Sequence, residues 1–239
     1  MSYEEPIEEP IETYREEPLE DNEIHSEESD IQIPEEEVSE GNLSTTNEVI
    51  KTTDLCLIAG KRGSGKTNLL LYLIKQLTQS KMNLIIIDPV YDLRDNLPKN
   101  DPRIVHIPYG NRKKFDAILL KLLKSGWKGM LIVDEADRFF PNRTKLTNLE
   151  NHFIQIGRHY GIGMIAVTRR LSNLHTDLAT QASKLFMFKH WNRNDLMYLK
   201  ESSLGEYAAL LVGLEKYHFL YLNPDVDIAQ ICTPVPIQK

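Results

Sequence analysis

The sequence predicts an α/β protein, with a mainly parallel sheet covered by helices on both faces and preceded by a disordered acidic tail. Short apolar runs of strand length alternate with segments whose apolar residues recur at helical spacing. Runs that are apolar on both faces are typical of parallel strands buried between helices. The charge is also divided sharply along the chain, which separates the tail from the folded part.

The acidic segment covers residues 1–50. It holds sixteen Glu and two Asp against Arg15, a net charge of −17, which leaves +10 on the rest because the whole chain carries −7. A segment this rich in charge cannot bury enough apolar surface to offset the entropy lost on ordering. We therefore expect a disordered tail at 1–50 and one folded domain at 51–239. The tail either aids solubility or tethers a partner, such as a capsid or membrane protein.

The expected elements follow one another without a repeat. The first strand, residues 55–59, precedes a helix whose apolar positions run from Leu69 to Leu77. After it we expect strands at 83–87 and 103–107, a helix at 113–124, a strand at 130–133, a helix within 149–160, strands at 162–168 and 184–188, two short helices and a last strand at 217–222.

A glycine-rich motif joins the first strand to the first helix. It reads Gly60-Lys61-Arg62-Gly63-Ser64-Gly65-Lys66-Thr67 and fits G-x-x-x-x-G-K-[ST] at every fixed position. Such a turn lets backbone N–H groups surround a phosphate at a helix N-terminus. We expect these residues and Asn68 to bind ATP, with Lys66 on the phosphates and Thr67 as a ligand of Mg²⁺.

A second acidic motif completes this expected site. The apolar run 130–133 ends in Asp134 and Glu135. Asp134 is placed to hold the Mg²⁺ shell, as a Walker B aspartate does. Glu135 is expected to point the other way in an extended chain and to orient and deprotonate the attacking water. The pair predicts hydrolysis of ATP rather than binding alone.

The downstream half resembles the FtsK/HerA superfamily of DNA-pumping ATPases. The resemblance rests on Arg158-His159-Tyr160-Gly161, on the stretch from Thr168 to Asn173, and on Ile87-Asp88-Pro89. It implies a RecA-like P-loop fold of the ASCE type and ATP bound between subunits of a ring, which we expect to be a hexamer. Arg158 is the arginine expected to act across the interface, with Arg169 and Arg170 as alternatives.

Two positions depart from that pattern. The superfamily places a sensor glutamine where this chain has Arg169, and a proline where it has Leu171. An arginine cannot act as a neutral amide, although it can contact phosphate as a cation. We therefore expect Thr168 or Arg169 to act as the sensor.

Within the superfamily, a minimal motor with an acidic tail is similar to the genome-packaging ATPases of tailless icosahedral viruses with an internal membrane. The resemblance implies movement of double-stranded DNA by its phosphate backbone, without sequence preference and with steep salt dependence. The expected DNA-contacting cations are Arg138, Arg143, Lys145, Arg112, Lys113 and Lys114.

Three other functions stay open: a HerA-like helicase or repair translocase, a motor for filamentous-phage extrusion, and an ATP-gated assembly switch that hydrolyses slowly. No signal peptide is present and no apolar run approaches the roughly 18 residues of a membrane span. We therefore expect an intracellular or virion-associated protein that is not secreted.

Overall fold

The computed structural model describes residues 38–41, 50–108, 110–189, 192–201 and 204–238. All of them belong to one compact unit, residues 31–239. Most of the acidic segment lies outside the described residues, so the division of the chain at residue 50 stays a prediction.

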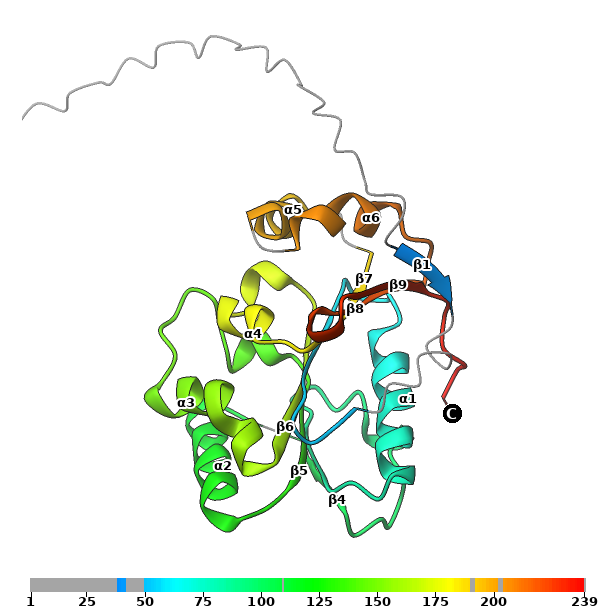
Figure 1. Ribbon diagram of the computed structural model, residues 1–239. Helices are drawn as coiled ribbons and strands as arrows, with labels where there is room; N and C mark the ends of the chain where they lie inside the picture. Colours follow the sequence, from blue (N-terminus) through cyan, green and yellow to red (C-terminus); the bar gives the residue numbers. More distant parts are fainter. Residues whose placement is uncertain (1–37, 42–49, 109, 190–191, 202–203, 239) are drawn as a thin grey trace, which may run out of the picture. The chain divides into compact units, whose positions relative to one another are not determined.

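The described part of the chain forms a nine-stranded sheet (Figure 1) in the order β1-β9-β8-β7-β2-β6-β5-β3-β4. The strands from β2 to β7 run parallel, whereas β8 is antiparallel to both of its neighbours. The predicted mainly parallel α/β fold is thereby confirmed. The bounds are β1 Val38–Gly41, β2 Leu55–Ala59, β3 Leu84–Ile87, β4 Ile104–Ile107, β5 Gly129–Val133, β6 Ile162–Thr168, β7 Lys184–Phe188, β8 Phe219–Asn223 and β9 Ile228–Cys232.

Six α-helices accompany these strands in the described part. Their bounds are α1 Lys66–Gln79, α2 Arg112–Ser125, α3 Asn148–Ile156, α4 Thr176–Thr180, α5 Arg193–Glu201 and α6 Ala208–Gly213. Helix α3 begins with a capping box, in which the Thr147 hydroxyl accepts from the Glu150 N–H and the Glu150 carboxylate accepts from the Thr147 N–H. The predicted helix within 149–160 is thus α3 followed by a 3₁₀ turn, Gly157–Tyr160.

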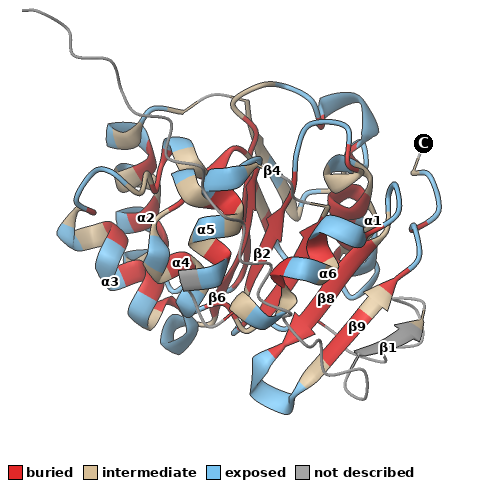
Figure 2. Ribbon diagram, turned by 90° about the horizontal axis from the view of Figure 1, so that it is seen from above, coloured by how far each residue is buried: buried red, intermediate tan, exposed pale blue. Residues whose placement is uncertain are grey.

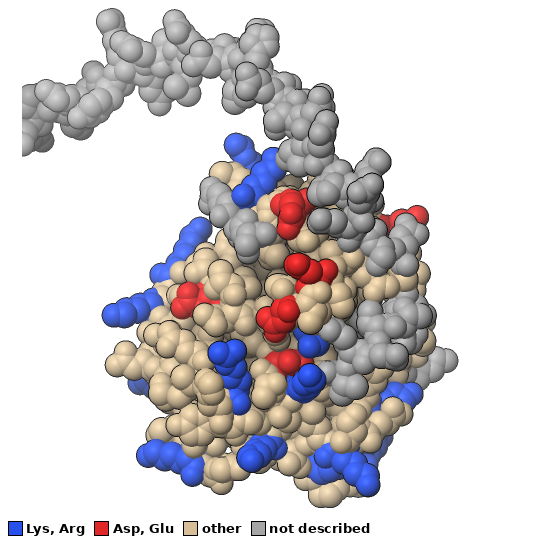
Figure 3. All heavy atoms as spheres, in the orientation of Figure 1, with Lys and Arg blue, Asp and Glu red and all other residues tan. Residues whose placement is uncertain are grey.

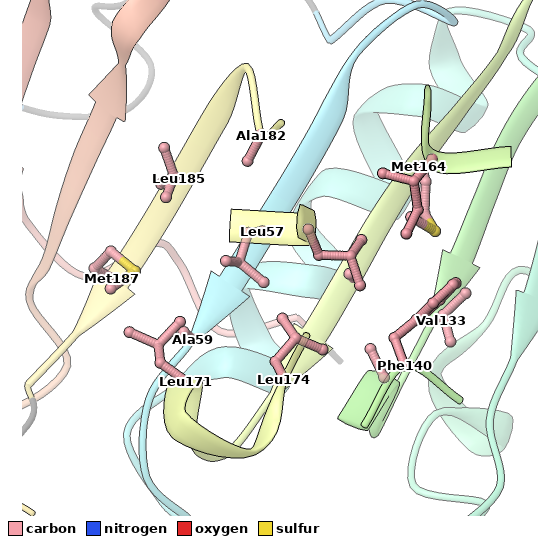
Figure 4. Close-up of a cluster of buried hydrophobic side chains, with 14 of the residues drawn as sticks. Leu57, Ala59, Val133, Phe140, Met164, Leu171, Leu174, Ala182, Leu185 and Met187 are labelled. Atoms are coloured by element: carbon pink, nitrogen blue, oxygen red, sulfur yellow. The ribbon is translucent and has the colours of Figure 1, made fainter. Parts of the chain in front are cut away.

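Alternate residues of the central strands feed two separate cores. Cys56 and Ile58 of β2 pack with the buried face of α1, whereas Leu57 and Ala59 join the core under the other helices. This follows from the period of two along a strand. Figure 4 shows part of the second core, and Figure 2 shows the buried sheet between exposed helix faces. Apolar burial on both faces is what makes these runs continuous in the sequence.

Two strands, β1 and β9, were not predicted from the sequence, and β9 follows the strand that was expected to be last. β9 is a short apolar run interrupted by the polar Gln230, and it pairs with β8 after the turn at Pro224. β1 lies inside the range predicted as disordered and pairs in parallel with β9. Its sequence, Val-Ser-Glu-Gly, carries no strand pattern, so its position depends on hydrogen bonds to β9.

The strand order brings the glycine-rich turn, the acidic motif after β5 and the end of β6 to one edge of the sheet. β6 lies between β2 and β5, with Ala59 opposite Thr168 and Val133 opposite Ala166. The residues that follow these strands therefore emerge together at the carboxyl ends, where ligands of such sheets bind.

Candidate active site

The glycine-rich turn is held against β7. Gly65 ends the turn with φ +109°, a backbone conformation that L side chains rarely adopt. A Cβ added to Gly60 would lie 2.6 Å from Cβ of Phe188, which is itself buried at the end of β7. The turn can follow this path only with glycine at both positions.

The same turn carries polar groups suited to a phosphate. The Ser64 hydroxyl is buried and has no hydrogen-bond partner within the described residues. Lys66 donates from Nζ to the Lys61 carbonyl at 2.8 Å, which places its ammonium beside the loop. A buried hydroxyl without a partner and an ammonium over a glycine-rich loop fit the triphosphate of ATP.

Lys66 is set in a partly buried environment. Burial is the main reason that its pKa is lowered to about 8, and the nearby Arg169 lowers it further, while Asp134 and Glu135 oppose the shift. An anion bound here would favour the charged ammonium. A bound phosphate would therefore shift the pKa of Lys66 back toward its ordinary value.

Asp134 follows β5 directly. Burial is the largest cause that raises the pKa of its carboxyl to about 6, with the negative charges of Glu135 and Asp88 adding to it. The Glu135 N–H donates to Oδ1 at 2.9 Å and opposes the shift. The half-buried Asp134 carboxylate and the Thr67 hydroxyl line one cavity, and oxygen ligands of this kind suit a hard divalent cation.

Glu135 does not continue the strand. Its φ and ψ are 49° and 46°, the left-handed conformation, so the expectation of an extended chain at this residue was wrong. The turn still delivers the side chain to the cavity, where the exposure of the whole residue is 9 %. Its Oε1 pairs with the Arg169 guanidinium, and its Oε2 lies 3.9 Å from Nε of Arg138.

Thr168 ends β6 between the glycine-rich turn and Asp134. Its residue exposure is 1 %, and its hydroxyl lies 3.2 Å from Oδ1 of Asp137 and 3.1 Å from the Arg170 carbonyl. The Thr168 carbonyl accepts from the Gly60 N–H at 3.3 Å. This strand end is therefore connected directly to the phosphate-binding turn.

One cavity joins most of the expected site residues. Its lining combines residues of the glycine-rich turn and α1 with residues at the ends of β5 and β6: Arg62, Gly63, Lys66, Thr67, Leu70, Asp134, Glu135, Val167, Thr168 and Arg169. Asp92 also lines it. Asp92 was not expected there. It belongs to the loop after β3, in which the buried Asp88 carboxylate accepts from the Asp92 and Leu93 N–H groups and so holds the loop together. The signal in the sequence that could have predicted Asp92 as a site residue was an acidic residue shortly after the end of β3.

Arg158 lies elsewhere. It belongs to the 3₁₀ turn before β6 and lines a different cavity with Thr53, Asp54 and Gln181, at the amino ends of the strands. β2 is five residues long, which at about 3.3 Å per residue separates the two edges by roughly 15 Å. Arg158 is exposed, and it is not part of this chain's own nucleotide cavity.

The six cations expected to contact DNA differ in their surroundings. Lys113, Lys114, Arg143 and Lys145 are exposed. Arg112 is used within the protein, because its guanidinium pairs with both carboxylate oxygens of the buried Glu150 and donates to the Lys145 carbonyl at 2.9 Å. The expectation for Arg112 is therefore corrected: it joins α2, α3 and the loop of Lys145. Arg138 lies near Glu135 as described above.

The Arg112 contact also brings the first turn of α2 beside the loop that carries Arg143 and Lys145.

On the face drawn in Figure 3, basic side chains lie mainly around the rim, and several acidic ones lie toward the middle. No helix within the described residues is both long enough and apolar enough to span a membrane.

The parallel sheet, the glycine-rich turn and the carboxylates after β5 together define a P-loop ATPase. The family model described as zonular occludens toxin (Zot) matches residues 55–195. The chain belongs to the Zot family. A search among curated proteins finds no match.

Solved structures of viral ATPases are also similar. B204, described as the DNA-packaging ATPase from Sulfolobus turreted icosahedral virus, is 26 % identical with a TM-score of 0.68, over 78 % of this chain and 100 % of that one. The genome-packaging NTPase B204 of Sulfolobus turreted icosahedral virus 2, bound to ATP-γ-S, is 24 % identical with a TM-score of 0.70, over the same shares. These matches confirm the resemblance to FtsK/HerA-like viral packaging ATPases.

A cellular ATPase shares the fold at a greater distance. The cytoplasmic domain of the type VII secretion ATPase EccC from Thermomonospora curvata is 15 % identical with a TM-score of 0.54, over 77 % of this chain and 24 % of that one. The fold is thus shared with a much longer protein.

Proposed function

We propose that this protein hydrolyses ATP to move double-stranded DNA and that it packages a viral genome into a preformed capsid. The observation that carries the proposal is the meeting of three strand ends at one cavity, in a chain that covers the full length of a viral DNA-packaging ATPase. The first supports hydrolysis of ATP, and the second supports DNA as the load.

The chain's own residues supply the binding groups for the nucleotide. Backbone N–H groups of residues 60–67 and of Asn68 surround the phosphates, and Lys66 adds a positive charge. Thr67 and Asp134 would hold Mg²⁺, which would neutralise charge on the phosphates when bound.

The proposed catalytic side chains are those that line the cavity at the ends of β5 and β6. Glu135 orients the attacking water and takes its proton. Arg169 is a cation beside Glu135, and it and Thr168 would sense the terminal phosphate of the nucleotide. The buried position of Glu135 limits competition from bulk water.

Assembly into a ring, most simply a hexamer, would complete the site. Stabilising the transferring phosphoryl group calls for an arginine, and Arg158 lies too far from its own cavity to provide it. An exposed Arg158 on one subunit is available to the cavity of the next. A shared site of this kind would link hydrolysis to movement between subunits.

The DNA contacts are proposed for Lys113, Lys114, Arg143 and Lys145, with Arg138 nearer the cavity. Side chains of this kind bind phosphate without reading bases, so binding is expected to be independent of sequence. The acidic segment at residues 1–50 is proposed as a docking tail for a capsid or membrane-protein partner. The protein would then act in the host cytoplasm, the virion, or both.

The test is the rate of ATP hydrolysis with and without duplex DNA, with the Lys66→Ala variant as a control for contaminating ATPases. A motor is expected to be stimulated severalfold by duplex DNA of any sequence, and less so at high salt. A slow rate that is indifferent to DNA would overturn the proposed translocation and favour an assembly switch. No hydrolysis above the Lys66→Ala background, in any condition, would overturn the ATPase assignment itself.

A further inference from the structure

Tyr217 is an exposed aromatic residue in an unusual conformation. It belongs to the turn before β8, its exposure is 46 %, and its φ is +69°. Bulky side chains rarely adopt the left-handed region, and such residues cluster at ligand sites. Tyr217 has no role in the phosphate-binding or catalytic part of the proposed site.

The tyrosine ring lies against the phosphate-binding turn. A Cβ added to Gly65 would be 3.4 Å from Cδ1 of Tyr217, so the edge of the ring borders the last glycine of the turn. The Lys216 ammonium lies 4.9 Å from the ring centroid, a cation–π arrangement. The ring is thus placed beside the start of α1 on the side of β7 and β8.

The C-terminal segment closes the neighbouring side. The Asn68 amide donates to the carbonyls of Val235, at 3.1 Å, and Pro236, at 3.3 Å, and it accepts from the Gln238 N–H at 2.9 Å. Val235 is buried in the core beneath α1, and Figure 1 draws this red segment beside that helix. The Asn68 side chain is therefore engaged within the protein.

These contacts bound the space that is open to the rest of a nucleotide. A triphosphate held by residues 60–67 leaves its ribose and base to extend outward from the start of α1. On that side lie the exposed ring of Tyr217 and the C-terminal segment around Val235. The Asn68 amide is not available to a base there, because it is hydrogen-bonded to that segment. A purine base has two flat apolar faces, for which an aromatic ring is a natural partner.

We propose that Tyr217 is the stacking platform for the purine base of the bound nucleotide. This rests on the proposed nucleotide site and adds to it a residue that recognises the base. Stacking on one ring contributes to affinity for the nucleoside part and leaves the phosphate contacts unchanged.

The test compares a nucleotide with its phosphate chain alone. Binding of AMPPCP and of inorganic tripolyphosphate, each with Mg²⁺, is measured by calorimetry for the wild type, Tyr217→Ala and Tyr217→Phe. Tyr91→Ala is the matched control, since Tyr91 is also exposed, at 51 %, with φ +64°. Thermal unfolding of each variant shows whether it is folded.

Tyr217→Ala is expected to weaken AMPPCP binding by roughly 5- to 100-fold, the range of one base–aromatic stack, and to leave tripolyphosphate binding unchanged. Tyr217→Phe and Tyr91→Ala should bind both ligands as the wild type does. Unchanged AMPPCP binding in Tyr217→Ala would overturn the inference, and so would an equal loss for both ligands, which would indicate a distorted turn. A wild type that binds neither ligand would instead refute the proposed nucleotide site.

Discussion

The guanidinium of Arg169 pairs with the carboxylate of Glu135 across the carboxyl ends of β6 and β5. Glu135 is nearly buried, while the Arg169 side chain is 45 % exposed at the mouth of the cavity. The cation that replaces the superfamily's glutamine is therefore in direct contact with the proposed catalytic base. The two residues are expected to act as one unit.

Arg169→Gln, which introduces the superfamily's residue, is expected to lower kcat by about tenfold or more, because Glu135 loses the partner that positions it. KM for ATP should change by less than about threefold, since Arg169 is not part of the phosphate-binding turn. Steady-state kinetics in the presence of duplex DNA separates the two parameters. A rise in KM alone would show that Arg169 contributes to binding and not to the positioning of Glu135.

Glu135→Gln tests the base itself. The amide is close in shape to the carboxylate but cannot take a proton from water, so kcat should fall by roughly 10²- to 10⁴-fold with ATP affinity nearly unchanged. Single-turnover hydrolysis and a separate binding titration make the measurement. Glu206→Gln, at an exposed position, is the control. Turnover at the wild-type rate in Glu135→Gln would exclude this role for Glu135.

Much of this site could be predicted from local sequence. The glycine-rich turn and the apolar run before Asp134 are contiguous, and their strand–turn–helix setting follows from hydrophobic spacing. The side-chain pairs are different, because Arg169 meets Glu135 only through the order of the strands, and Arg112 meets Glu150 across two helices. The turn at Glu135 also shows that an apolar run does not fix the conformation of the residues after it.

The end of the chain illustrates the same limit. Val235, Pro236 and Gln238 contact Asn68 across more than 160 positions of sequence, and none of these residues carries a motif. Their role in bounding the site comes from β9, which brings the chain back toward α1. Contacts of this kind depend on topology and cannot be found from local spacing.

Asp134→Asn is expected to stabilise the protein when Mg²⁺ and nucleotide are removed. A carboxyl whose pKa is raised to about 6 in the folded state, against an ordinary value of 3.8, binds more protons folded than unfolded between these pH values. Stability is therefore lost as the pH rises through this window. The uncharged Asn keeps an acceptor for the Glu135 N–H, so at pH 7.5 the gain should be about 1–3 kcal/mol.

Urea unfolding with EDTA at pH 7.5 and at pH 4 measures this effect. The advantage of Asp134→Asn should shrink toward zero at the lower pH, where the wild-type carboxyl is already mostly protonated. The same variant should lose hydrolysis, because it lacks the charged ligand for Mg²⁺. A variant less stable than the wild type at pH 7.5 would contradict the assignment of a partly buried, destabilising charge to Asp134.

Lys113→Gln/Lys114→Gln is expected to weaken binding to duplex DNA and to reduce its salt dependence. Each lost phosphate contact should lower the slope of log K against log salt by about 0.9. The matched control is Lys121→Gln/Lys124→Gln, which removes the same charge from exposed positions of the same helix. Cations in the first turn oppose the helix dipole, so removing Lys113 and Lys114 should not destabilise α2. Equal losses in both variants would indicate an effect of net charge alone.

Arg158→Ala should abolish most hydrolysis while leaving ATP binding intact, since Arg158 lies at the opposite edge of the sheet from its own cavity. If Arg158 acts in the cavity of the neighbouring subunit, mixing Arg158→Ala subunits with Lys66→Ala subunits should restore some activity. An interface can then form with an intact cavity from one variant and an intact arginine from the other. Activity is measured across mixing ratios, and it should peak near equal amounts. Each variant mixed with itself is the control. A mixture that stays inactive at every ratio, although both variants assemble, would place Arg158 outside the reaction of its neighbour.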